Sequence, residues 1–159
     1  MGKVLSTFPN GFPGAISRSV DNIVISMANG ADADIPFGAP LFFVPGQNAC
    51  EPFSESSEAE NFLGFSARAA VKTPETYGES EAVFTSGDPV DVLVRGSVVV
   101  SFAHGVDPGA AVYIRKADGA LVTNPGAAGT TLLLPNVTVR TASDADNRAE
   151  VVLTKRNLI

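Results

Sequence analysis

The sequence has few of the residues that catalysis, disulfide bonding and metal binding require. Its 159 residues include one cysteine, Cys50, one histidine, His104, and no tryptophan. A single cysteine forms no intrachain disulfide and lacks the partners of a structural zinc site. We therefore expect Cys50 to be a small, partly buried thiol. His104 follows an apolar run and precedes Gly105, so we expect it to be solvated polar surface and not a catalytic base.

Local catalytic motifs are missing as well. The chain has no Gly-x-Ser-x-Gly elbow, no phosphate-binding loop and no dinucleotide fingerprint. Because a catalytic site needs a nucleophile, a base and an orienting group within reach of one another, we assign no catalytic and no cofactor-binding residue. The sequence predicts a protein that is not an enzyme and holds no cofactor.

Charge is scarce and predominantly negative. Charged residues make up 18% of the chain, and its formal net charge is −6. An acidic chain without a basic run repels phosphate, so we expect no nucleic-acid partner. Residues 1–20 contain no secretory signal, and runs such as Val98-Val99-Val100 are far shorter than the roughly 20 residues of a membrane-spanning helix. We expect no membrane partner and a protein that is made and used in the cytoplasm, or in something assembled there.

Two groups of acid and amide side chains are the candidate ion sites. The first comprises Asn29, Asp32 and Asp34, and the second comprises Asp144, Asp146, Asn147 and Glu150. Oxygen ligands at alternate positions suit Ca²⁺, but neither group has the glycine and terminal glutamate of the twelve-residue calcium loop. Both compositions are also typical of turns. We assign no metal ligand, and the sequence leaves open whether loops 29–34 and 144–150 bind an ion.

Glycine and proline, with 15 and 11 residues, separate short apolar runs. The runs that we expect to be strands lie at residues 22–28, 37–44, 62–71, 90–95, 97–102, 112–117, 120–123, 132–141 and 149–154. Between two of these runs, the acidic segment 51–61 is expected to be a solvated loop, although Ser57 and Glu60 have the spacing of a helix-capping box. Regularly spaced short strands with Gly/Pro turns predict an all-β, single-domain antiparallel β-sandwich or barrel.

Two hairpins are predicted in the second half of the chain. Alternation over residues 90–102 indicates two strands that turn at Arg95-Gly96, with Val92 and Val100 in the core and Asp91 and Arg95 outside. Asp118-Gly119 is a strong signal for the other turn.

A short pattern, Gly-x-small-aliphatic, recurs where β runs begin. It is found at Gly38-Ala39-Pro40-Leu41, Gly87-Asp88-Pro89-Val90 and Gly109-Ala110-Ala111-Val112. Glycine permits a bend there, and proline at the first residue of a strand costs no ladder bond.

Residues 1–20 are expected to form an extended N-terminal arm, and residues 21–159 the β domain. Pro9, Gly11, Pro13 and Gly14 keep this segment out of a helix or a sheet interior. Its apolar residues, among them Phe12, either fold back on the domain or insert into a neighbouring subunit.

The run Ser86-Gly87-Asp88-Pro89-Val90-Asp91-Val92-Leu93-Val94-Arg95-Gly96-Ser97-Val98-Val99-Val100 resembles the structural cement (decoration) proteins of tailed phages. The similar pieces continue through Pro108–Ile114, Gly119–Thr123 and Ala149–Leu153. This resemblance implies an all-β, jelly-roll-like domain that binds the outside of a phage capsid and stabilises it. It also implies the major capsid protein and further copies of the chain, as a dimer or trimer, as partners. The location that it implies is the capsid surface of a virion assembled in the host cytoplasm.

Another β-structured phage part remains the alternative: a tail or spike module, or a carbohydrate-binding module. Sugar rings stack on tryptophan and tyrosine, and the chain has only Tyr77 and Tyr113. The aromatic content therefore disfavours the sugar binder.

Overall fold

The structure is a computed structural model that describes residues 10–68 and 83–157. Its strands are β1 (Ile16–Asn29), β2 (Ile35–Pro36), β3 (Pro40–Phe43), β4 (Ala49–Pro52), β5 (Phe62–Ser66), β6 (Val83–Phe84), β7 (Pro89–Ser101), β8 (Ala111–Arg115), β9 (Leu121–Val122), β10 (Thr131–Val139) and β11 (Arg148–Leu153). One 3₁₀ turn, η1 (Ala59–Asn61), precedes β5. The all-β prediction is confirmed.

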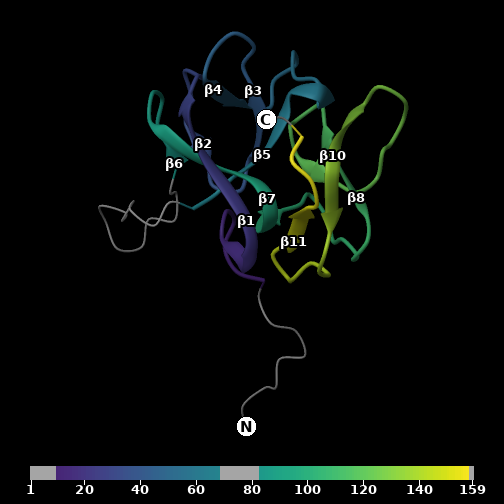
Figure 1. The fold of residues 1–159 in the computed structure, drawn as a ribbon. Coiled ribbons are helices and arrows are strands. Elements are labelled where there is room, and N and C mark those ends of the chain that lie inside the picture. Colours follow the sequence, from purple (N-terminus) through teal and green to yellow (C-terminus); the bar gives the residue numbers. More distant parts are fainter. Residues whose placement is uncertain (1–9, 69–82, 158–159) are drawn as a thin grey trace.

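Five strands close into a barrel. They are ordered β1-β4-β3-β5-β7, and β1 also pairs with β7, so the ring has no gap (Figure 1). All pairs in it are antiparallel except β1–β4, which is parallel over Ala28 and Asn29. The barrel interior is filled by buried apolar side chains. They are Met27, Ile35, Leu41, Cys50, Leu63, Phe84, Val90, Val92 and Val94.

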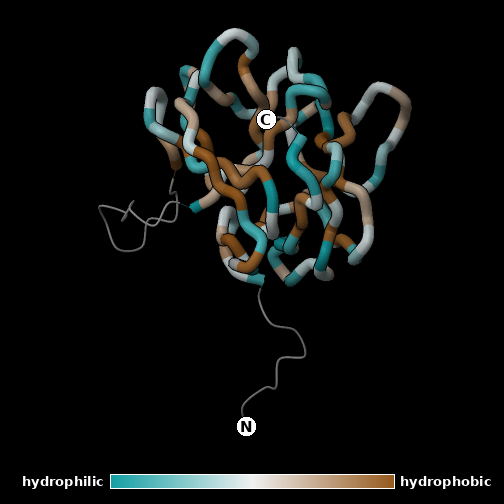
Figure 2. Tube along the Cα trace, in the orientation of Figure 1, coloured by the Kyte–Doolittle hydropathy of each residue, from teal (hydrophilic) through white to brown (hydrophobic). Residues whose placement is uncertain are grey.

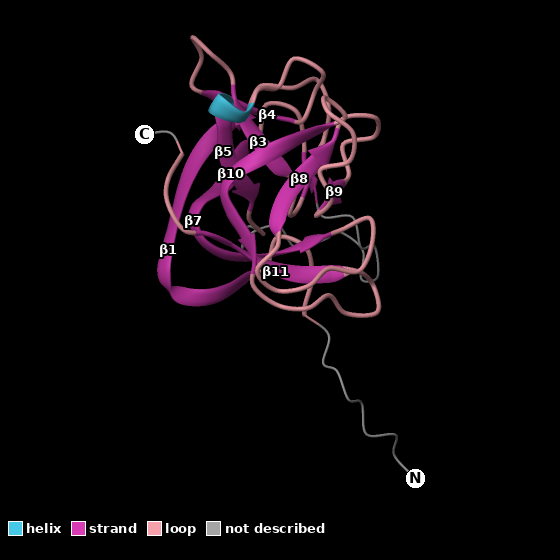
Figure 3. Cartoon of the chain, turned by 90° about the vertical axis from the view of Figure 1, so that its right-hand side faces the viewer, coloured by secondary structure: helices cyan, strands magenta, loops and turns pink. Residues whose placement is uncertain are grey.

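The other strands extend the sheet from β7 in the order β11-β10-β8-β9. They curl over the outside of β3, β5 and β7 and enclose a second core (Figure 3). On the barrel side of this core, the ring of Phe62 contacts those of Phe42 and Phe65 edge to face, with ring centroids 5.7 and 5.6 Å apart. Val112, Ile114, Val137, Val139 and Val151 face them from the extension. The domain is thus a barrel that shares one wall with a sandwich.

Residues 89–101 form one continuous strand, so the predicted hairpin at Arg95-Gly96 is wrong. Residues 97–101 pair with β11 and not with residues 90–95. Gly96 has a φ of 120° and bends the strand. Before the bend Val92 points into the barrel, and after it Val100 points into the second core. Glycine inside a strand permits such an irregularity because it carries no Cβ.

The bend in β7 has a counterpart in β1. Arg18 pairs with Ser97 and Ile23 with Arg95, so the four residues 19–22 lie opposite Gly96 alone. We call residues 19–22 the β1 corner. A Cβ on Gly96 would lie 3.1 Å from Cα of Asn22, so the corner rests directly on the glycine.

Other sequence predictions agree with the structure. Val92 and Val100 are fully buried, whereas Asp91 and Arg95 are partly exposed. Strands β8 and β9 pair as a hairpin around Asp118-Gly119.

The glycine pattern at the start of β runs is also confirmed. β3, β7 and β8 each begin at its third residue. All three pattern glycines, Gly38, Gly87 and Gly109, have a positive φ.

In the acidic segment, the capping box does not form. Ser57 Oγ accepts a hydrogen bond from Ser54 N–H, and η1 has no side-chain cap. Ser57 therefore closes its own turn instead of capping the helical one.

Candidate interaction surfaces

The turn between β10 and β11 lies at the lower end of the molecule in Figure 1, where β1 begins. Asn10 is bonded to this turn. Its side-chain amide donates to Ala142 O at 2.9 Å and Arg148 O at 2.7 Å, and its backbone N–H donates to Asp144 Oδ2 at 3.0 Å. We call these three bonds the Asn10 anchor. They tie the N-terminal segment to a part of the chain more than 130 positions away.

Backbone hydrogen bonds within the turn hold the Asp144 carboxylate in the position where it accepts the Asn10 N–H. Its second carboxylate oxygen accepts the N–H groups of Asp146 and Arg148 at 3.0 and 2.9 Å. Burial alone raises the pKa of Asp144, but the hydrogen bonds from Asn10, Arg148 and Asp146 outweigh it and lower the pKa below its usual range. The carboxylate is therefore ionised at neutral pH, and its oxygens are occupied by backbone donors.

Residues 11–15 continue from the anchor along the barrel. Gly14 N–H donates to Val99 O at 2.9 Å, and Gly14 O accepts from Arg68 N–H at 2.8 Å. Residues 16–20 already belong to β1. The proposed boundary at residue 20 stays a prediction: residues 1–9 lie outside the described residues, Asn10 is bonded to the β10–β11 turn, and Gly14 is bonded to β7.

Phe12 is held in this bonded segment with its ring outside. The residue is 63% exposed, and its ring centroid lies 5.7 Å from the guanidinium of Arg148, which also donates to Gly11 O at 3.4 Å. A cation over an aromatic face is attractive, so the ring is fixed in position while most of it remains open to solvent. The lower end thus presents a rigid, exposed aromatic ring.

Strand β1 adds further exposed apolar side chains. Val20, in the β1 corner, is 97% exposed, and Ile16 and Val24 are 39% and 42% exposed. Ion pairs hold the corner on both sides. Arg18 Nε lies 2.9 Å from Glu150 Oε1, and Asp21 Oδ2 lies 2.9 Å from Arg95 Nη2.

Glu150 is a nearly buried carboxylate on β11. Besides Arg18 it faces Arg140, whose Nε lies 3.6 Å from Glu150 Oε1. Two guanidinium groups compensate one charge, which is the condition under which a buried carboxylate is tolerated. Glu150 therefore fixes the start of β1 to β11.

A pocket of about 590 Å³ opens on the outer face of β8, β9 and β10. Val122 and Ala117 line it, together with residues of the 124–131 loop. Its cations are Arg115 and Lys116, and Arg115 forms an ion pair with Asp118. His104 also lines the pocket, with Nδ1 2.7 Å from Gly105 O and Nε2 accepting from Thr123 N–H at 3.4 Å.

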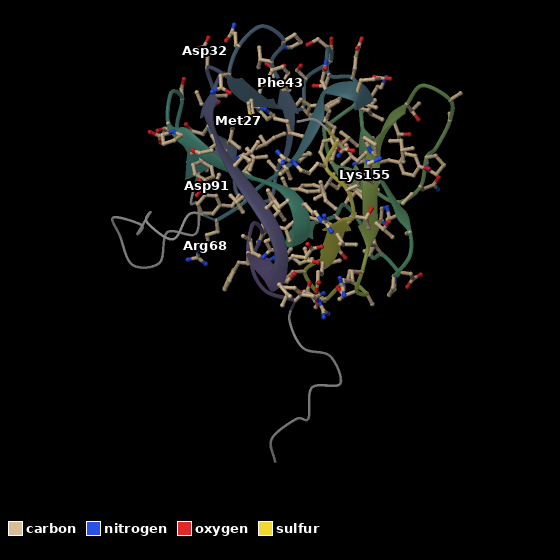
Figure 4. The ribbon with its side chains drawn as sticks, viewed as in Figure 1. Met27, Asp32, Phe43, Arg68, Asp91 and Lys155 are labelled. Carbon is tan, nitrogen blue, oxygen red and sulfur yellow. The ribbon has the colours of Figure 1, made fainter. Side chains whose placement is uncertain are left out.

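The two candidate ion sites serve other contacts. Asn29 is buried, donates from Nδ2 to Ala33 O and Thr85 O, and accepts from Ala31 N–H. Asp32 lies in a loop at the upper end (Figure 4), whereas the 142–148 turn is at the lower end. Within residues 10–68 and 83–157, no group of three or more His, Cys, Asp or Glu side chains is placed to hold a metal ion.

Cys50 is fully buried inside the barrel, as an apolar filler. Burial raises the pKa of its thiol to about 11, so at neutral pH it is protonated and not nucleophilic. In the described part of the chain, no helix is long and apolar enough to cross a membrane.

Sequence reasoning missed the surface features that matter most. The contacts that fix these surfaces join distant parts of the chain: Asn10 with the 142–148 turn, Arg148 with Phe12, and Arg18 with Glu150. No local pattern in the sequence predicts them. Val20 stands among polar residues, between Ser19 and Asp21, and its outward position depends on Gly96 across the strand pair. The only local signal was Phe12 among glycines and prolines.

The Asn10 anchor predicts how Asn10→Ala behaves. Two side-chain hydrogen bonds are lost, at a local cost of about 1–3 kcal/mol. We expect faster native-state hydrogen exchange at the Gly14 amide, with the Val100 amide unchanged. Asn124→Ala, which removes an amide from a distant loop, is the control and leaves Gly14 unchanged. Wild-type protection of Gly14 in Asn10→Ala would show that the anchor does not hold this segment.

Comparisons with known proteins agree with this architecture. The family model described as structural cement protein (E217 gp24/Pam3 gp6) matches residues 3–154. A chain in the solved structure "The capsid of Myoviridae Phage XM1" superposes with a TM-score of 0.70, at 15% sequence identity, over 96% of each chain. At that identity the likeness shows the fold alone. No curated protein matches the sequence. Because the family model spans nearly the whole sequence, this chain belongs to the structural cement protein family of phages.

Proposed function

We propose that this protein binds the outer surface of a phage capsid and stabilises it as a cement protein. The observation that carries the proposal is the family match over residues 3–154. The fold suits the role, because two cores in a closed barrel and sandwich give a stiff body with exposed apolar side chains on its surface. Exposed apolar side chains mark an interaction site where they lie together, and Phe12, Ile16, Val20 and Val24 lie within one segment of the chain.

The major capsid protein is the partner that we assign, and the lower end of the molecule is the surface. Phe12 lies there, exposed and fixed by Arg148 and the Asn10 anchor. A ring that is ordered before binding loses little conformational entropy on binding. The loops at the upper end are mostly white and teal in Figure 2, and η1, which ends the acidic segment 51–61, lies at this end (Figure 3). We place the polar upper end away from the capsid, on the outside of a virion assembled in the host cytoplasm.

This role requires no catalysis. Both ring nitrogens of His104 contact backbone atoms, and the Cys50 thiol is buried and protonated. We infer that neither acts as a nucleophile or base.

Binding to heads that lack this protein tests the proposal. The wild-type protein is expected to co-sediment with such heads. Burial of a phenylalanine contributes about 1.5–3 kcal/mol, so Phe12→Ser should weaken binding by about 10- to 100-fold. Phe12→Tyr keeps the ring and should bind like the wild type.

The two parts of the proposal fail differently. Wild-type protein that stays in the supernatant would contradict capsid binding itself. Full binding by Phe12→Ser would leave capsid binding intact and show that the lower end is the wrong surface.

A further inference from the structure

The β1 corner is a protrusion held in place from beneath. Val20 is 97% exposed at its tip, yet the backbone below it is fixed against Gly96. Asp21 follows Val20, is exposed, and pairs with Arg95 at 2.9 Å. The tip therefore offers an apolar side chain with a carboxylate beside it. A fixed valine in water is unfavourable, and burial in an apolar pocket would stabilise it.

The pocket on β8, β9 and β10 is walled by an ordered loop. Thr130 Oγ1 donates to Ala127 O and Thr131 Oγ1 to Pro125 O, both at 2.6 Å. Lys116 N–H donates to Thr130 O at 2.9 Å, which ties the wall to the end of β8. The pocket is thus formed before anything enters it.

The chemistry of the pocket matches the tip of the corner. Its lining residues include Lys116 but no acid, so the entrance is suited to a carboxylate. Val122 and Ala117 supply apolar surface within, and Leu133, 48% exposed, continues that surface along β10. About 590 Å³ is room for the tip as a whole, with Val20 inside and Asp21 at the entrance.

A chain cannot fill its own pocket in this way. β1 lies at the left edge of the view in Figure 3, while β8 and β9 face the reader. The two features are on different sides of one rigid domain, so the tip that enters the pocket must come from another copy.

We propose that copies of this chain associate head to tail, with the β1 corner of one copy seated in the β8–β10 pocket of the next. Val20 fills the apolar part, and Asp21 meets Lys116. Such a contact is heterologous, because each copy inserts its own corner into one neighbour and receives the corner of another. The assembly closes into a ring when the rotation between successive copies allows it. The contact uses Val20 and the pocket and not the Phe12 side chain, so Val20→Asp and Phe12→Ser test self-association and capsid binding separately.

Complementation between two variants of the full chain tests the contact. Val20→Asp places a charge at the tip, and Ala117→Trp fills the pocket; both positions are exposed, so wild-type melting temperatures are expected. In sedimentation velocity the wild type should assemble, and each variant alone should assemble at least about 100-fold more weakly. An equal mixture should form a heterodimer, because Val20→Asp retains a pocket and Ala117→Trp retains a corner.

A charge reversal at Lys116 supplies the second measurement. Lys116→Glu should weaken association, because it places a second carboxylate opposite Asp21, whereas Lys116→Arg keeps the charge and should assemble like the wild type. A monomeric wild type at every soluble concentration, wild-type assembly of both single variants, or no heterodimer in the mixture would each overturn the proposal. Loss of head binding by Val20→Asp with assembly unchanged would also overturn it, since Val20 would then contact the capsid.

Discussion

Val92→Asp is expected to leave the protein unfolded at room temperature. Val92 is fully buried inside the barrel, on β7 opposite Ile25 of β1. A carboxylate there would have only apolar neighbours, and an unpaired buried charge costs several kcal/mol or more. Domains of this kind have about 5–15 kcal/mol of stability in total. Thermal unfolding followed by circular dichroism would show the loss of the cooperative transition.

Val24→Asp is the matched control for this change. Val24 lies on the neighbouring strand, one position from the partner of Val92, but points outward and is 42% exposed. The same chemical change should lower the melting temperature only slightly. A folded Val92→Asp with a wild-type melting temperature would mean that Val92 does not point into the barrel and that the register of β7 against β1 is wrong.

Gly64→Ala is expected to destabilise the protein strongly, although it adds one methyl group. A Cβ on Gly64 would lie 1.9 Å from Leu93 O and 2.9 Å from Leu93 C. These are backbone atoms of β7, so relief of the clash requires β5 and β7 to separate. Those strands form the wall shared by both cores, and we expect a loss of several kcal/mol in the free energy of unfolding, measured by urea titration.

Gly105→Ala is the control for Gly64→Ala. The nearest atom to a Cβ at Gly105 is Ser143 Oγ at 3.5 Å, an ordinary contact. Its urea midpoint should stay close to that of the wild type. Equal midpoints for the two variants would contradict the close approach of β5 to β7.

Local signals predicted the fold class because turns and strands are encoded locally. Gly38, Gly87 and Gly109 precede the starts of β3, β7 and β8, and Asp118-Gly119 forms the turn of a hairpin. All four glycines have a positive φ, which glycine adopts more easily than any residue with a Cβ. Gly96 shows the limit of this reasoning. Alternation on both sides of a glycine is the same for a hairpin and for a bent strand, and the choice depends on β11, which is distant in the sequence.

The closure of the barrel and the surfaces depend on contacts between distant residues. β1 pairs with β7, and Asn10 meets the 142–148 turn, so neither appears in a single window of sequence. From the sequence, the acidic group at residues 144–150 was compatible with a turn or an ion site. In the structure, Asp144 of this group also accepts a hydrogen bond from the backbone N–H of Asn10. Functional reasoning from the residues alone gave absences; the resemblance to cement proteins supplied the positive hypothesis, and the family match confirms it.

The thermal rupture of phage heads tests the central claim most directly. Heads that lack this protein are heated with and without the purified wild type, and release of packaged DNA is followed by a fluorescent dye. A cement protein binds the intact shell in preference to the ruptured one, so the rupture temperature should rise as the protein saturates the heads. Phe12→Ser should shift this rise to higher protein concentration. Saturated binding with an unchanged rupture temperature would contradict the claim that this protein stabilises the capsid.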